Sequence, residues 1–129
     1  MSEASAPASK TIGDQLVAYC RDGKNLECIN TLYADDVVSI EAAEGGAGPR
    51  VTKGKEGVIG KNTWWQENME VRRASVDGPF PHGDDRFAVI FDFDVKNKQT
   101  GDEMTMKEVG VFHLGGGKVV REEFFYAMG

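Results

Sequence analysis

In the first third of the chain, apolar residues recur every three or four positions, the spacing of one face of a helix. Ile12, Leu16 and Cys20 share such a face, which predicts a first helix over residues 11–21. A second, shorter pattern of the same kind predicts a helix over residues 25–33. Each segment presents one apolar stripe, so we expect both helices to pack against a common core.

The middle of the chain changes from strand-like to loop-like and then back to helical patterning. Residues 37–42 (VVSIEA) are rich in β-branched side chains, which favour a strand. Residues 44–53 contain three glycines and a proline, so a loop is expected there. A third helix is predicted over residues 55–68, with Trp64 and Trp65 among its apolar anchors.

Beyond the third helix the hydrophobic period falls to two, as in strands with one buried face. Polar or glycine-rich turns separate the strands, so they should form an antiparallel meander. Helices segregated from an antiparallel sheet define an α+β protein, which we expect as one domain over residues 11–129 after a disordered tail of residues 1–10. The predicted strands cover residues 70–80, 86–95, 104–114 and 118–126.

Composition removes several classes of function. The 129 residues carry a formal net charge of −6, a poor match for a phosphate backbone, so no nucleic-acid partner is expected. No apolar run is long enough to cross a bilayer, and the N-terminus lacks the pattern of a secretory signal, so we expect a cytoplasmic protein without a membrane partner. Cys20 and Cys28 lack metal-ligand spacing and the two histidines lie far apart, so neither a metal site nor a cofactor is predicted.

Several short segments, in this order, resemble the ketosteroid-isomerase-like or SnoaL-like superfamily, also called nuclear-transport-factor-two-like, over about residues 11–126. The resemblance implies a strongly bent, mostly antiparallel sheet wrapped around N-terminal helices as a cone with an apolar cavity. Superfamily members act as isomerases, dehydratases, cyclases or hydrolases, or only as binding or dimerisation modules, so the fold does not determine the function. The segments that carry the resemblance are Gly23, Leu32–Val38 (LYADDVV), Gly54 and Gly115–Tyr126 (GGGKVVREEFFY).

The resemblance can be carried to single positions of the ketosteroid-isomerase site. It places Glu41 where those enzymes have their catalytic Asp base. Their first oxyanion-hole donor, a Tyr, falls on Leu16, and their second, a protonated Asp, falls on Gly110 or Val109. Without both donors a dienolate would lose several kcal/mol of stabilisation, so steroid isomerase activity is not expected.

Two glutamates are the candidate catalytic residues. Glu41 has apolar neighbours along its expected strand, and apolar surroundings disfavour the charged form, which suits a carboxyl to proton transfer near neutral pH. Glu108 has the same period-two parity as Phe112, so the two should face the cavity together, where Glu108 can share a proton with Glu41. The alternatives are a solvent-facing Glu41 and a salt bridge between Glu108 and a nearby arginine.

A second group of residues is expected to contact a ligand without reacting with it. On the last strand, the family match turns every second side chain from Glu122 onward into the cavity. The adjacent tryptophans of the third helix point about 100° apart, so one should pack in the core and the other line the cavity mouth. Core packing with a satisfied hydroxyl is the alternative for the tyrosines. The predicted binding residues are Tyr19, Trp64, Trp65, Phe112, Glu122, Phe124 and Tyr126.

Two functions therefore remain open at the level of sequence. One is a cofactor-independent isomerase, cyclase or dehydratase that acts on a small, largely apolar molecule (aromatic, polyketide-like or steroid-like), with Glu41 moving a proton. The other is a non-catalytic ligand-binding or dimerisation module. Val109, Val111 and Phe125 leave apolar area on the sheet face opposite the helices, so a homodimer is expected in either case.

Overall fold

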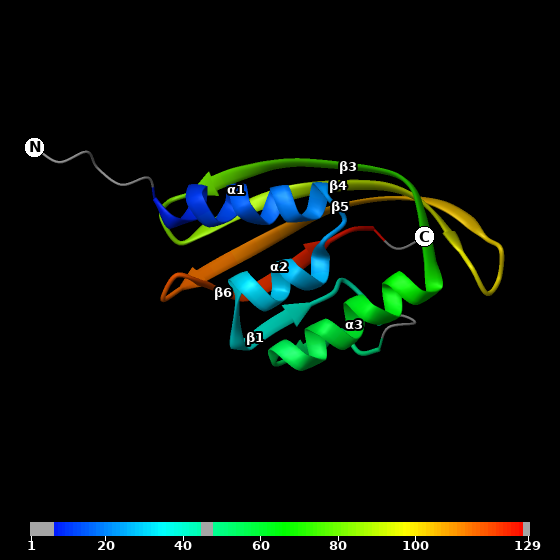
Figure 1. Ribbon diagram of the computed structural model, residues 1–129, viewed down its shortest axis with the longest axis horizontal. Helices are drawn as coiled ribbons and strands as arrows, with labels where there is room; N and C mark the ends of the chain where they lie inside the picture. The colour runs from blue at the N-terminus through cyan, green and yellow to red at the C-terminus, as the bar shows by residue number, and fades with distance from the viewer. Residues whose placement is uncertain (1–6, 45–47, 128–129) are drawn as a thin grey trace, which may run out of the picture.

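The computed structural model of the chain describes residues 7–44 and 48–127. Within these residues, three helices lie against one six-stranded sheet, which confirms the α+β class (Figure 1). The elements in chain order are α1 (Ala8–Arg21), α2 (Asn25–Leu32), β1 (Tyr33–Ile40), β2 (Val51–Lys53), α3 (Lys55–Asn68), β3 (Met69–His82), β4 (Arg86–Asn97), β5 (Glu103–Gly115) and β6 (Lys118–Phe125).

The order of the strands joins the two ends of the chain. Strands β3 to β6 form the predicted antiparallel meander, and the full order is β2-β1-β6-β5-β4-β3. Strand β1 pairs in parallel with β6, which aligns Ser39 with Glu122. The sheet is strongly curved: β3, β4 and β5 arch over α1, whereas β1 and α3 lie on the far side of α2 (Figure 1). The curvature leaves the inner face of the sheet turned toward all three helices.

Alternation along the long strands makes this inner face apolar. Phe87 and Phe112 are fully buried neighbours on β4 and β5, and their rings stack with centroids 5.2 Å apart. Gly110 makes room for the neighbouring rings of Phe112 and Phe91, because a Cβ atom there would lie 2.9 Å from the first ring and 3.1 Å from the second. From the other side, Leu16 of α1 packs into the same core.

The first helix begins three residues earlier than predicted, at Ala8 rather than at Thr11. Ser9 is fully buried, and its hydroxyl donates a hydrogen bond of 2.8 Å to the carbonyl of Gly83 in the β3–β4 turn. This contact is tertiary, so no local pattern could reveal it. The start of the predicted tail, residues 1–6, lies outside the described residues.

The first two strands also differ from the prediction. Strand β1 begins at Tyr33 rather than at Val37, because Tyr33 pairs with Val119 of β6 instead of ending the second helix. The strand ends at Ile40, so Glu41 lies just beyond it, where its backbone amide donates a hydrogen bond of 2.8 Å to the carbonyl of Arg50. Strand β2 forms inside the segment predicted as a loop. It is three residues long, mostly exposed and held by pairing with β1, so its own sequence carries no strand pattern.

An apolar row crosses the outer face of the sheet, on the side away from the helices. Ile90, Val109 and Phe125 are cross-strand neighbours on β4, β5 and β6. Phe125 is 50% exposed, and the next row places Ala88 beside Val111. Exposed apolar surface of this kind commonly marks an interface between subunits.

We expect the chain to form a homodimer through this row. Light scattering at micromolar concentration should give about twice the 14.1 kDa mass of one chain. Phe125→Asp places a charge in the row and should shift the mass toward that of one chain, whereas Val51→Asp, at an exposed position on β2, should not. A wild-type mass of one chain would contradict this expectation.

Candidate functional site

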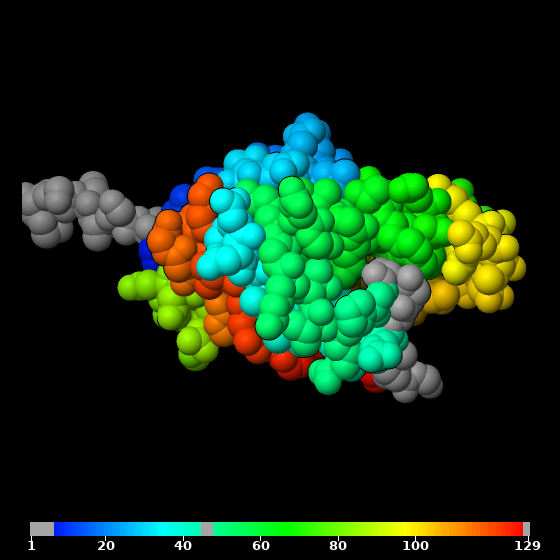
Figure 2. All heavy atoms as spheres, turned by 90° about the horizontal axis from the view of Figure 1, so that it is seen from below, coloured from blue at the N-terminus to red at the C-terminus, as the bar shows by residue number. Residues whose placement is uncertain are grey.

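A cavity of about 390 Å³ lies between the helices and the inner face of the sheet. Its size suits a small organic molecule. Figure 2 shows the molecule from the side of α3, whose side chains spread over the middle of that face. Most of the cavity wall is apolar and aromatic, so the wall favours an apolar ligand body. The large apolar lining residues are Leu16, Ile29, Trp64, Trp65, Met69, Phe91, Phe93, Met104, Met106, Phe112 and Phe124.

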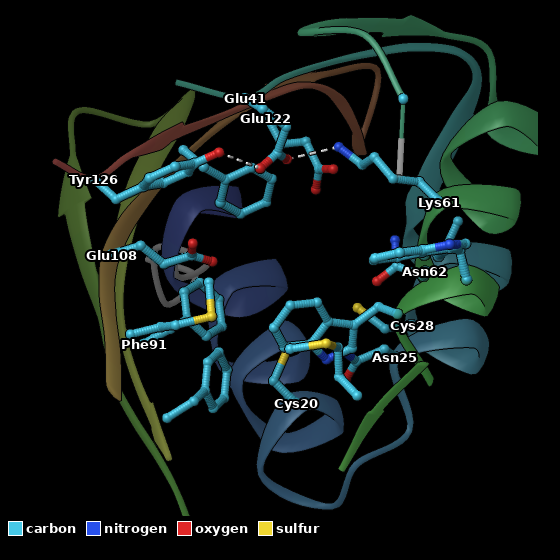
Figure 3. Close-up of a pocket in the computed structure, with 18 of the residues that line it drawn as sticks. Cys20, Asn25, Cys28, Glu41, Lys61, Asn62, Phe91, Glu108, Glu122 and Tyr126 are labelled. Carbon is cyan, nitrogen blue, oxygen red and sulfur yellow. Dashed lines mark hydrogen bonds and ion pairs between the residues drawn. The ribbon is translucent and has the colours of Figure 1, made fainter. Parts of the chain in front are cut away.

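Polar groups gather at one end of the cavity (Figure 3). The ammonium group of Lys61 lies 2.7 Å from Oε2 of Glu41, and the Tyr126 hydroxyl donates a hydrogen bond of 3.2 Å to Oε1 of Glu41. The side chains of Lys61 and Glu41 are only 12% and 24% exposed. The carboxyl oxygens of Glu41 thus contact an ammonium group and a hydroxyl group, whereas the sequence predicted apolar surroundings for this carboxyl.

Behind this ion pair lies a second, deeper carboxyl group. Glu122 is 2% exposed and accepts hydrogen bonds from the hydroxyls of Tyr33 and of Ser39, the latter at 2.6 Å. Burial raises the pKa of Glu122, and the two hydroxyl donors partly oppose that rise. Lys61 also donates to Ser39 Oγ at 2.6 Å. A continuous chain of hydrogen bonds thus runs from the buried Glu122 to Glu41 at the cavity.

Glu108 stands apart from this chain. It pairs with Phe91 across β4 and β5, and its side chain enters the cavity from the sheet wall (Figure 3). Among the described residues, its carboxyl has no hydrogen-bond partner. Burial, followed by the negative charges of Glu41 and Glu122, raises the pKa of Glu108 to about 7, and the positive charge of Lys61 partly opposes that rise. Near neutral pH, both protonation states of Glu108 are therefore populated.

The structure brings most of the predicted site residues together. Tyr19 is the exception, because it packs against the core while its neighbour Cys20 lines the cavity. Both tryptophans line the cavity, where one had been expected in the core. The alternative of an arginine partner for Glu108 does not hold among the described residues, because Arg72, Arg73 and Arg121 pair with other carboxylates. The predicted residues on the cavity wall are Glu41, Glu108, Trp64, Trp65, Phe112, Glu122, Phe124 and Tyr126.

Three functional residues were not predicted from the sequence, namely Lys61, Ser39 and Tyr33. The signal for Lys61 is its spacing, since it lies three residues after the fully buried Val58 and four before Trp65, on the inner face of α3. Ser39 lies two residues before Glu41 and so has the parity of an inward-facing position. A charged residue on a helix is usually solvated, which explains why the spacing of Lys61 was overlooked.

Two thiols form part of the wall on the helix side. Cys20 and Cys28 are both free and both line the cavity. A hydrogen bond to Cys20 and burial raise the pKa of the Cys28 thiol, which keeps that thiol protonated. In the part of the chain that the structure describes, no three His, Cys, Asp or Glu side chains are grouped so as to hold a metal ion. No helix in that part is long and apolar enough to span a membrane.

The comparisons with known proteins agree with this architecture. The model of the SnoaL-like domain family matches residues 8–126, so the chain belongs to that family. A crystal structure from Mesorhizobium loti, assigned provisionally as a SnoaL-like polyketide cyclase, is 41% identical and has a TM-score of 0.83, with 90% of this chain and 97% of that one covered. No curated protein sequence matches the chain.

More distant structures share the fold, and their descriptions name small-molecule ligands. RV0760c from Mycobacterium tuberculosis, in complex with estradiol-17beta-hemisuccinate, is 21% identical with a TM-score of 0.72, covering 95% of this chain and 96% of that one. A computationally designed 17-OHP binder is 21% identical with a TM-score of 0.68, covering 96% and 94%. At this level of identity, the two structures establish the shared fold.

The raised pKa of Glu108 predicts a pH-dependent loss of stability. Because its pKa is about 7 in the folded chain against an ordinary 4.5, the folded state binds the proton more tightly. The stabilisation is complete below the ordinary pKa and is lost as the pH rises through about 7, by at most about 3 kcal/mol. Glu108→Gln should lack this loss, so urea unfolding should show the variant gaining on the wild type between about pH 5 and about pH 8.

Glu67→Gln, at an exposed position on α3, is the matched control and should follow the wild type at every pH. Identical pH profiles for Glu108→Gln and the wild type would mean that Glu108 is not in the environment described.

Proposed function

We propose that this SnoaL-like protein binds a small, largely apolar molecule in its cavity and moves a proton on it without a cofactor. Glu41 and Glu108 act as the two proton-transfer groups. The observation that carries the proposal is that two carboxyls with opposite surroundings face one apolar cavity. A carboxylate that is ion-paired with a lysine is suited to act as a base, and a carboxyl whose ionisation is opposed by burial is suited to act as an acid.

Each carboxyl has a definite part in this scheme. Glu41, which is ion-paired with Lys61 and accepts a hydrogen bond from Tyr126, accepts a proton from the ligand. Glu108, which has no hydrogen-bond partner among the described residues, is protonated below a pH of about 7 and donates a proton to another atom of the ligand. The net result is an isomerisation, a cyclisation or an elimination, depending on the ligand.

The shape of the cavity supports a flat, apolar ligand body. The ring of Phe93 contacts Trp65 on one side and Phe91 on the other along the wall, with ring centroids 6.5 and 5.9 Å apart respectively. Such walls favour stacking with an aromatic or polycyclic molecule. The two steroid ligands named for the distant structures above are molecules of this general shape.

A specific observation favours a second function, namely ligand binding without catalysis. The position of the first ketosteroid-isomerase oxyanion donor holds Leu16, an apolar residue of the cavity wall. The second donor position falls on Gly110 or Val109, and the space at Gly110 is filled by the rings of Phe91 and Phe112. In this alternative, Glu41 completes the polar network and the ligand leaves unchanged.

The first test concerns binding. Small hydrophobic aromatic compounds should raise the melting temperature, because they bind the native state and not the unfolded chain. They should also quench the fluorescence of Trp64 and Trp65, which both line the cavity. A broad set of aromatic compounds that produces neither effect would contradict both proposed functions.

The second test concerns catalysis. With a ligand that the protein turns over, Glu41→Gln should lower the rate by about 10²- to 10⁴-fold and leave ligand affinity largely unchanged. The wild-type rate should fall as the pH rises through about 7, because Glu108 loses the proton that it donates, and Glu108→Gln should lose that dependence. Glu67→Gln is again the control. A Glu41→Gln variant that turns over the ligand at the wild-type rate would remove Glu41 from the chemistry.

A further inference from the structure

We propose that Lys61 is a further catalytic residue, whose ammonium group binds the ligand oxygen that becomes negatively charged when Glu41 removes a proton. This inference rests on the proposed function, because it assigns a partner to the same proton transfer. It also assigns the type of ligand atom involved, the oxygen of an enolate or a phenolate.

The placement of Lys61 is the first argument. Its side chain lines the cavity, is 12% exposed, and holds its ammonium group 5.6 Å from the centroid of the Phe124 ring (Figure 3). An ammonium group has three donors, and the structure engages two of them, on Ser39 Oγ at 2.6 Å and on Glu41 Oε2 at 2.7 Å. These two hydrogen bonds fix the position of the ammonium group, so its positive charge lies at one place in the cavity rather than in solvent.

The distance between base and cation is the second argument. In a carbonyl compound, standard bond lengths place the carbon next to the carbonyl group about 2.4 Å from the carbonyl oxygen. Glu41 Oε2 and Lys61 Nζ are 2.7 Å apart. Such a ligand can therefore present its C–H bond to Glu41 and its oxygen to Lys61 at the same time.

The balance of charge is the third argument. When Glu41 takes the proton, the C–H bond breaks, its electron pair moves into the ligand and the negative charge appears on the carbonyl oxygen. Glu41 becomes neutral at that moment and releases Lys61, which pairs with the new oxyanion. One ion pair replaces another, so the cavity never holds an additional unpaired charge, which would be costly in low-dielectric surroundings.

The apolar residues at the former donor positions are the fourth argument. Leu16 at the first position and Gly110 or Val109 at the second offer no hydrogen-bond donor from their side chains, so an oxyanion needs stabilisation from elsewhere on the wall. In the cavity lining that the structure describes, Lys61 is the one cationic side chain. Lys61 lies on α3, whereas the two positions that match the ketosteroid-isomerase donors lie on α1 and β5.

Two probes of nearly the same shape test this inference. 4-Nitrophenol can lose its O–H proton to Glu41 and changes colour when it does, whereas 4-nitroanisole carries a methyl group and cannot ionise. At a pH where free 4-nitrophenol is mostly neutral, the wild-type protein should bind it as the phenolate, which absorbance detects. Lys61→Gln should bind it as the neutral phenol, with an affinity about ten- to hundredfold lower. Lys61→Arg, which keeps the charge, should retain phenolate binding.

4-Nitroanisole reports whether the cavity itself is intact. Its affinity should be the same, within about twofold, for the wild type, Lys61→Gln and Lys61→Arg. If 4-nitroanisole binds but the wild type holds 4-nitrophenol in the neutral form, or if Lys61→Gln holds as much phenolate as the wild type, Lys61 does not stabilise an oxyanion and the proposed cavity function stands without it. If neither probe binds the wild type, the proposed function fails and this inference fails with it.

Discussion

The burial of the Glu122 carboxyl is the constraint on which the site depends. A carboxyl removed from water costs several kcal/mol unless hydrogen bonds replace its hydration. Tyr33 and Ser39 supply those bonds, and both lie on β1, which the parallel pairing places beside β6. Ser39 in turn receives a hydrogen bond from Lys61, and Lys61 holds Glu41. The position of Glu41 at the cavity thus follows from the hydrogen bonds that the buried Glu122 requires.

This chain of contacts divides the polar groups of the cavity into two kinds. In the described part of the chain, every buried side-chain nitrogen and oxygen has a hydrogen-bond partner, so the network can lie within an apolar core without an uncompensated group. Glu108 lies outside the network and exchanges its proton near neutral pH. The fold therefore combines a set of side chains joined by hydrogen bonds with one carboxyl that no hydrogen bond ties to that set.

Local periodicity was enough to predict the helices, the meander and the inward parity of Glu108, because each depends on the spacing of apolar residues in one segment. Strand β2 and the parallel pairing of β1 with β6 depend on contacts between distant segments, so no local pattern shows them. Tyr19 and Cys20 are adjacent, and adjacent side chains on a helix point about 100° apart. This difference is enough to place Cys20 at the cavity and Tyr19 against the core. Lys61 was missed because its charge suggests solvent, whereas its spacing relative to Val58 places it inside.

The place of β6 between β1 and β5 has a consequence for how the chain folds. The meander from β3 to β6 can form from neighbouring segments, and β1 can pair early with the short β2. The other edge of β1 has to wait for a partner synthesised 86 residues later, as the pairing of Tyr33 with Val119 shows. Contacts of such long sequence separation close large loops, so their formation is entropically expensive and slow. Until β6 is in place, the helical N-terminal half has an open sheet edge and an exposed apolar surface, and that intermediate is the stage at which the nascent chain is most prone to aggregate.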